Sequence, residues 1–339
     1  MNTTNFTILV NQSETYESPQ VLCSVEEFFT CYNYFINKNL FKSIFGIFTF
    51  SMAAVLNFTV IGMLALRQAS STIFDKILIG LCFVDGLVAV IDIPIFHVMD
   101  IFGYNPFGYG LTFSWSLFDN SINTITNLHM LYLSWAQYRS INSPMNFKGE
   151  LLFRKPYLMM LFIWVFSMIS WLPFVLLFGI VEFTTNVNYQ PYFIGNIINL
   201  FLWLIPLILI LILTILVIRA LSMRKFKSKK FINYNSSKKT TVLHNKDKVS
   251  LRMRLVSLKR FIPQKLSPEV KLLIIMISYL LQWFLPSTLT IFNGILFDAP
   301  VNVSFGIYWL TYTVCLTHPA IMLVSNSNIS RKNKVKHYK

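Results

Sequence analysis

Residues 81–94 have the sequence LCFVDGLVAVIDIP, an apolar run interrupted by only two carboxylates, Asp85 and Asp92. This run lies inside a longer apolar segment, residues 75–99. A helix needs about 20 mostly apolar residues to cross the hydrocarbon core of a bilayer. Because the segment reaches that length in spite of Asp85 and Asp92 in its interior, we predict that it spans a membrane as a helix.

The rest of the chain has the same character. Of its 339 residues, 55% are hydrophobic and 13% are charged, whereas roughly a quarter of a soluble domain is charged. The apolar residues form long runs instead of the short alternating segments that are typical of a β-barrel. We therefore predict an all-α membrane protein, a seven-transmembrane helix bundle. The candidate spans are residues 43–66, 75–99, 110–138, 157–181, 192–218, 270–296 and 303–325.

The positive charges indicate how the bundle is oriented. Seven spans place residues 67–74, 139–156, 219–269 and 326–339 on one side of the membrane. Together with Lys76 and Lys271 at the adjoining span ends, these segments hold 27 of the 29 Lys and Arg residues. Because basic loops remain in the cytoplasm, we predict that the N-terminus lies outside and the C-terminus lies in the cytoplasm.

This orientation divides the chain into an extracellular N-terminus (1–42), a seven-helix domain (43–325) and a short basic cytoplasmic tail (326–339). The basic loop 219–269 has low hydrophobicity, so we expect partial disorder there, with helical extensions of the fifth and sixth spans at its ends. Basic runs such as RKFKSKK at residues 224–230 fit topology and anionic lipid, and we expect no nucleic-acid binding.

The N-terminal segment carries sites for covalent modification. Asn2, Asn5 and Asn11 each begin an Asn-x-Ser/Thr sequon, so we predict glycosylation on the extracellular side. Cys23 and Cys31 lie in the same segment, and the sequence leaves open whether they pair. The sequence contains no HExxH, GxSxG, paired CxxC or phosphate-binding Gly-rich motif. We therefore expect no enzyme, no cofactor and no metal site.

Asp119 is the strongest candidate for a ligand-binding residue. A carboxylate inside a membrane helix is costly unless it faces protein or water. Trp115 lies one turn earlier, and the seventh span offers Tyr308 and Tyr312. A carboxylate surrounded by aromatic rings can bind a small cation. The alternative is a packing role for Asp119, with Asn120, Asn123 or a backbone carbonyl as its partner.

A second polar cluster is expected in the middle of the bundle. Asp85 has Asn57, Thr126 and His318 as possible partners from three other spans. A buried carboxylate needs a cation, a protonated base or its own proton. The cluster is therefore either a charged Asp85–His318 pair or a neutral hydrogen-bonded group. Asp92 and His97, nearer the expected outer end, receive no role beyond lining the mouth of a cavity.

These residues, in this order, resemble the rhodopsin-like G-protein-coupled receptors over about residues 42–330. The resemblance rests on one marker in most spans. These markers are Asn57, Leu81, Asp85, Pro94, Trp164, Pro206, Pro286 and the stretch YWLTYTVCLTHP at residues 308–319. In the fourth span Trp164, Trp171 and Pro173 are similar to the pattern of muscarinic acetylcholine receptors.

Within that family the chain is closest in pattern to the aminergic receptors, of the muscarinic and histamine types. The resemblance implies that Asp119 pairs with a ligand ammonium and that Trp309 and Tyr312 close the pocket. It also places Phe284 at the switch tryptophan of the sixth span, with Trp283 adjacent. Two aromatic positions of such pockets are replaced, by Ser287 and Asn120.

Several switch positions depart from the family. The usual acid-Arg-aromatic triplet is Ala136-Gln137-Tyr138, so we expect Arg139 to point toward lipid headgroups instead of the G-protein cleft. Pro144 follows Gln137 at the family's spacing. His318 and Met322 replace the Asn and Tyr around Pro319. Thr112 replaces the third-span cysteine, so the usual loop disulfide is not expected.

The resemblance implies a receptor at the plasma membrane. It would sense a small extracellular ligand, such as a biogenic amine or a choline-like cation, and signal through a heterotrimeric G protein. The Gln137, Tyr138, Arg139 and Pro144 region would carry the coupling. Three alternatives stay open: a chemosensory receptor for a non-amine ligand, a non-signalling decoy or heteromer partner, and a transporter or channel.

Overall fold

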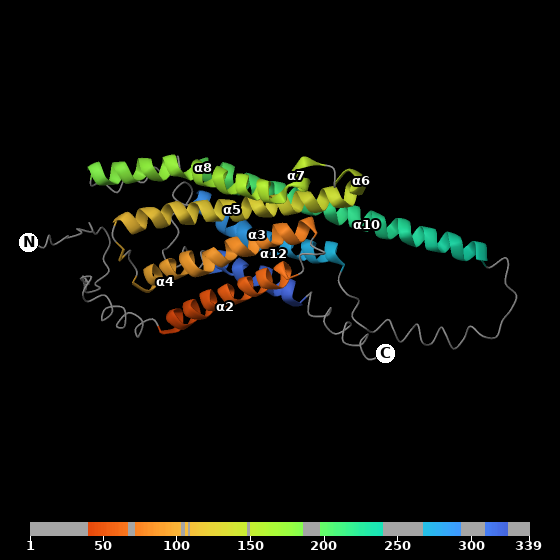
Figure 1. Cartoon of the computed structure of the whole chain (residues 1–339), viewed down its shortest axis with the longest axis horizontal. Coiled ribbons are helices and arrows are strands. Elements are labelled where there is room, and N and C mark those ends of the chain that lie inside the picture. The colour runs from red at the N-terminus through yellow and green to blue at the C-terminus, as the bar shows by residue number, and fades with distance from the viewer. Residues whose placement is uncertain are drawn as a thin grey trace, which may run out of the picture.

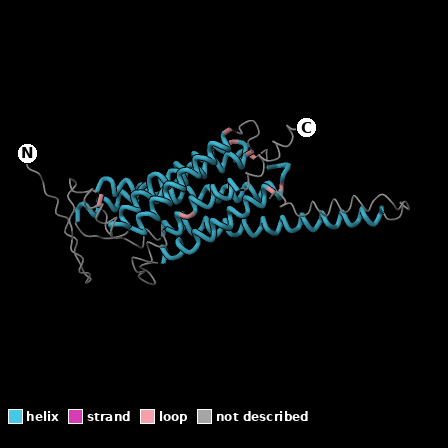
Figure 2. The backbone as a smooth tube through the Cα atoms, turned by 90° about the horizontal axis from the view of Figure 1, so that it is seen from below, coloured by secondary structure: helices cyan, strands magenta, loops and turns pink. Residues whose placement is uncertain are grey.

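The computed structural model describes residues 40–66, 72–102, 106–107, 109–147, 150–185, 197–239, 267–292 and 309–324. Within these ranges the regular elements are helices, which run roughly along one common axis (Figures 1 and 2). The predicted glycosylation sites Asn2, Asn5 and Asn11, the Cys23 and Cys31 pair, Tyr308 and the tail 326–339 lie outside the described residues.

Seven helical segments account for the seven predicted spans. Five are long and apolar enough to cross a membrane: Leu40–Ala65, Ile73–Phe102, Pro156–Leu177, Ile197–Arg224 and Pro268–Thr288. The other two are α5, Tyr109–Asn142, which is long but carries many polar residues, and the shorter apolar helix Trp309–Val324. The elements are α2 (Leu40–Ala65), α3 (Ile73–Leu87), η3 (Val88–Asp92), α4 (Ile93–Phe102), α5 (Tyr109–Asn142), α6 (Pro144–Phe147), α7 (Leu151–Arg154), α8 (Pro156–Thr185), η4 (Leu200–Leu204), α10 (Ile205–Lys239) and α12 (Pro268–Phe292).

The fifth span departs most from its predicted bounds. Its helix α10 continues past residue 218 as far as Lys239, and in Figure 1 it projects well beyond the rest of the bundle. A helical extension into the basic loop was expected at this end, and the structure confirms it. Residues 240–266 of that loop are outside the described part.

The polar helix α5 lies at the centre of the bundle and contacts α3, α8, α10 and α12. Its hydroxyl groups bond to carbonyls one turn earlier in the same helix, as in Thr126 to Ile122 and Ser134 to Met130. Serine and threonine satisfy their own polar groups in this way when no water is present. A helix with many polar residues can therefore lie inside an apolar bundle.

Two prolines follow directly on wide turns of the backbone. The π-helical segment η3 ends two residues before Pro94, and η4 ends two residues before Pro206. Proline has no N–H group and its ring clashes with the carbonyl four residues earlier, so an α-helix must adjust at that point. In both helices a turn with one extra residue makes the adjustment.

Large apolar side chains cover the outside of the bundle. Exposed residues of this kind recur along α2, α8 and α10, including Phe58, Leu161 and Ile212. Such a continuous apolar surface would be a liability in water, but it matches the hydrocarbon of a bilayer. The outer faces of these helices therefore fit a membrane environment.

Two glycines of α2 allow a test of the packing inside this bundle. A Cβ atom at Gly46 would overlap the His97 ring, whereas one at Gly62 would meet nothing within 4 Å. We expect Gly46→Ala to lower the apparent melting temperature, because overpacking costs about 1–3 kcal/mol. Gly62→Ala, the matched control in the same helix, should leave it unchanged or slightly higher, because alanine is the better helix former. Equal melting temperatures for the two variants in the same detergent would contradict the contact between α2 and α4.

Candidate functional site

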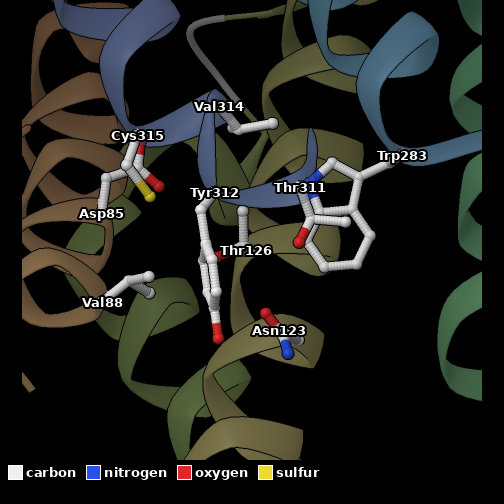
Figure 3. A pocket seen from close by; sticks show the side chains of 9 residues that line it. All are labelled: Asp85, Val88, Asn123, Thr126, Trp283, Thr311, Tyr312, Val314 and Cys315. Carbon is white, nitrogen blue, oxygen red and sulfur yellow. The ribbon is translucent and has the colours of Figure 1, made fainter. Parts of the chain in front are cut away.

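A small cavity of about 10 Å³, roughly the room that one water molecule needs, lies among the helices, and its walls come from four parts of the chain. Its lining residues are Asp85, Val88, Asn123, Thr126, Trp283, Thr311, Tyr312, Val314 and Cys315 (Figure 3). In Figure 3 the Tyr312 ring extends from the Trp309–Val324 helix toward Asn123 of α5. The cavity thus links the two polar clusters that the sequence predicted separately, one around Asp119 and one around Asp85.

Asp119 is buried, with 8% of its surface exposed. The Asn123 side-chain amide donates to its Oδ1 at 2.8 Å, from one turn later in α5. Asn123 also lines the cavity. The bond to Asn123 is the one that the packing alternative proposed, so Asp119 has a neutral partner on its own helix.

Trp115 interacts with a different carboxylate from the one we expected. Its indole N–H donates to Asp92 Oδ1 at 2.8 Å, across the contact between α5 and η3. Asp92 is completely buried, and its carboxylate interacts electrostatically with that of Asp119. Asp92, which the sequence analysis assigned only to the mouth of a cavity, is therefore a direct neighbour of Asp119.

Trp309 is held at the predicted outer end of the bundle. Its indole N–H donates to Asp100 Oδ2 at 3.0 Å, and Lys42 forms an ion pair with Asp100 Oδ1 at 3.1 Å. The rings of Phe96 and Tyr312 pack edge-on against Trp309 at centroid distances of 5.9 Å. Trp309 therefore ties together α2, α4 and the last helix, and its N–H group is already occupied.

The prediction for Phe284 is wrong in this structure. Its side chain is 46% exposed on the outside of α12, whereas the neighbouring Trp283 is 5% exposed and lines the cavity. Trp283 stacks on Tyr279 and meets Trp203 of η4 edge-on. Trp283 lies four residues after the buried Tyr279 and therefore on the same inward face of α12. Helical periodicity alone would have predicted Trp283, and not Phe284, as the inward-facing residue.

The central cluster contains one direct pair. His318 Nδ1 lies 3.0 Å from Asp85 Oδ2, and both residues are buried. The Asn57 amide nitrogen does not donate to Asp85, since it donates to the backbone carbonyls of Ala53 and Cys315. Thr126 bonds to its own helix and lines the cavity, and Pro319 is buried beside His318. Of the proposed partners of Asp85 that the structure describes, His318 is the one that forms a hydrogen bond with it.

Gln137 joins α5 to the first turn of α12. The side chain is fully buried, and its amide nitrogen donates to the Glu269 carbonyl at 2.7 Å. The Ala136-Gln137-Tyr138 triplet draws attention to Gln137 in the sequence. Its hydrogen-bond acceptor could not be predicted, because the acceptor is the backbone carbonyl of Glu269 and not a side chain. The helix ends are therefore connected by a neutral hydrogen bond.

The residues around Gln137 take different directions. Tyr138 packs against Ile141 and the α10 residues Val217 and Ala220. Arg139 forms an ion pair with Glu150 of the following loop, a partner that our expectation of lipid headgroups did not include. Pro144 is exposed and begins the short helix α6.

The described residues contain no group of three or more His, Cys, Asp or Glu side chains arranged to hold a metal ion. Cys82 and Cys315 are both buried and free.

Comparisons with known proteins agree with this architecture. The model of the 7 transmembrane receptor (rhodopsin family) matches residues 56–322, which is most of the chain. The Muscarinic acetylcholine receptor DM1 of Drosophila melanogaster is 26% identical over 104 residues. That alignment covers 31% of this chain and 13% of the relative, so it relates only a short part of the two proteins.

The family match covers the helices that carry Asp85, Asp119, Gln137 and His318. Its members are receptors and not enzymes, and the apolar helices mark a multi-pass membrane protein. With its seven helical segments, the chain belongs to the rhodopsin family of seven-transmembrane receptors.

Proposed function

We propose that this protein is a plasma-membrane receptor that binds a small extracellular cation at Asp119 and signals through a heterotrimeric G protein. The observation that supports the cation most is the burial of Asp119 beside a second carboxylate, Asp92, within reach of Trp115. Two neighbouring carboxylates in a bundle of low dielectric constant favour a bound positive charge. The ligand-binding group then comprises Asp119, Asn123, Trp115 and Tyr312, with Trp283 in place of Phe284.

Signalling would occur by a shift between two arrangements of the bundle. Ligand bound between α5 and the last helix would favour one arrangement. In that arrangement, the ends of α5, α10 and α12 would form the surface that binds the G protein. The contact of Gln137 with Glu269 belongs to the arrangement in which α12 lies against α5. The basic extension of α10 is suited to anionic lipid and to acidic surfaces of a partner.

The cation hypothesis can be tested without any assumption about coupling. The full chain, purified in detergent, would be heated with primary amines and with choline esters, alongside Asp119→Asn. A ligand at 100 times its dissociation constant stabilises a protein by about 2.7 kcal/mol. We expect at least one amine to raise the melting temperature of the parent and to have no such effect on Asp119→Asn.

The matched control is Asp75→Asn, which removes the same charge from the N-terminal cap of α3. This variant should retain the ligand-induced shift even if its own melting temperature falls. A shift that survives in Asp119→Asn would show that the ligand binds without the Asp119 carboxylate, and would contradict binding at this residue. The absence of a shift with every amine would contradict the cation hypothesis.

One observation favours a second candidate, a seven-helix receptor that binds ligand without activating a G protein. The buried Gln137 side chain is neutral where the family uses an arginine, so it cannot make the charge-assisted contacts of a guanidinium. Ligand-dependent binding of a purified G protein to the receptor distinguishes the two candidates. Ligand binding without any recruitment would indicate a decoy or a heteromer partner.

A further inference from the structure

The Asp92 and Asp119 carboxylates form an unusual pair. Asp92 ends the wide turn η3, Asp119 lies in α5, and the two interact with each other inside the bundle. Trp115 donates to Asp92 Oδ1 and Asn123 donates to Asp119 Oδ1, both at 2.8 Å, and the Tyr312 side chain also interacts with the Asp92 carboxylate. Asp92 Oδ2 is buried and receives no hydrogen bond from any described residue.

The pair therefore needs a shared proton or a positive partner. Two carboxylates side by side in a medium of low dielectric constant repel each other, so they either share a proton or hold a cation. Trp115 and Asn123 each bond to one oxygen of a carboxylate, and Asp92 Oδ2 remains a buried acceptor. A buried acceptor without a donor is costly, which favours a ligand that brings its own N–H groups.

We infer that Asp92 is a second anionic contact for the ligand and that the pocket selects cations with several N–H groups. Primary ammonium, guanidinium and amidinium groups belong to this class. An ammonium group can donate to both carboxylates at once, and a guanidinium group can do so through its rigid fork. This inference rests on the proposed cation-binding function and narrows its ligand class.

Quaternary ammonium ions fit this arrangement less well. They are held by net charge and by aromatic faces, but they have no N–H group to donate. With such a ligand, Asp92 Oδ2 would stay without a donor, and methyl groups would separate the nitrogen from both carboxylates. Asp92 thus favours cations with N–H groups over quaternary ammonium ions. With Asp119 alone, the affinities for the two kinds of cation would be more similar.

The test uses four probes with the same aromatic part: phenethylamine, its N-methyl form, its N,N,N-trimethyl form and phenethylguanidine. Their dissociation constants would be measured with the full-length receptor in detergent and with Asp92→Asn. We expect the parent to bind the primary amine and the guanidine at least tenfold more tightly than the trimethyl probe. In Asp92→Asn this ratio should fall to about threefold or less, chiefly through weaker binding of the N–H probes.

Comparing ratios between the two proteins removes the differences in hydration among the probes. A parent that binds the trimethyl probe as tightly as the primary amine would overturn the inference, and this result needs no variant. An unchanged ratio in a folded Asp92→Asn would overturn it as well. If no probe binds the parent, the proposed cation-binding function fails too, whereas binding without selectivity removes only the role of Asp92.

Discussion

Replacing His318 by alanine is expected to lower the free energy of unfolding by about 3–5 kcal/mol, the cost of removing one partner from a buried pair. The substitution leaves Asp85 buried without its 3.0 Å contact to the histidine ring. It also opens a space beside Tyr279, whose ring stacks on His318. The quantity can be measured by chemical denaturation of the parent and the variant in the same detergent.

Thr126→Val is the matched control for this loss. Thr126 lines the same cavity, but its hydroxyl group bonds only to Ile122 of its own helix. The two side chains have nearly the same shape, so we expect a change within about 1 kcal/mol. A loss for His318→Ala no larger than that for Thr126→Val would contradict a stabilising role of the pair.

Substituting asparagine at both positions isolates the interaction of the pair. The single variants His318→Asn and Asp85→Asn each disturb the contact, whereas the double variant places two neutral amides opposite each other. A double-mutant cycle then gives the coupling, which reaches about 0.5–3 kcal/mol for residues in contact. A double variant that is more stable than His318→Asn alone would favour the charged pair over the neutral cluster, because it removes the unpaired carboxylate.

The second large effect is expected at the other end of the bundle. Gln137→Leu should release the first turn of α12 from α5, because it removes the 2.7 Å bond to the Glu269 carbonyl. A neutral hydrogen bond contributes about 0.5–1.5 kcal/mol. The population in which α12 has moved away should therefore rise roughly two- to tenfold. Distances between spin labels at the exposed positions Asn142 and Ser267, attached through encoded amino acids, would report the change.

Ser140→Ala serves as the control for Gln137→Leu. The Ser140 hydroxyl bonds to the Gln137 carbonyl within α5 and does not reach α12. The distances between the spin labels at positions 142 and 267 should therefore have the same distribution in Ser140→Ala as in the parent. If Gln137→Leu also gives the parent distribution, the hydrogen bond does not hold the helices together.

The neutral side chain of Gln137 also affects how easily α12 moves away from α5. Hydrogen bonds to charged groups contribute about 1.5–3 kcal/mol, which is more than a neutral amide contributes. A receptor whose α5 and α12 are joined through Gln137 would therefore open at a smaller cost in free energy. We accordingly expect a higher basal population of the open arrangement than an arginine with an acidic partner would allow.

Most of the fold could be predicted because hydrophobic length is a strong signal. The segment 75–99 is recognisable as a span, because Asp85 and Asp92 in its interior do not outweigh its 17 hydrophobic residues. The boundaries were less predictable. The end of α10 at Lys239 depends on a basic stretch that leaves the membrane as a helix, and hydropathy gives no information about helices in water.

The site was predicted less completely. Asp119, Asn123 and Tyr312 could be chosen because a buried carboxylate and aromatic residues are visible in the sequence. The orientation of Trp115 could not, since its N–H group had two carboxylates within reach from different helices. The contact between Gln137 and Glu269 was equally hidden, because its acceptor is a backbone carbonyl. Contacts of this kind depend on how helices are placed, which a single sequence does not encode locally.

The wide turn η3 has a consequence for the whole second span. One extra residue in a turn advances the following α-helix by about 100° relative to an uninterrupted one. The turn therefore sets the angular phase between Asp85, which precedes it, and Asp100, which follows it. A single-residue deletion within Val88–Asp92 would shift that phase and carry Asp100 away from Lys42 and Trp309. Backbone geometry, and not any side chain, thus keeps the central and outer polar groups of this span facing inward together.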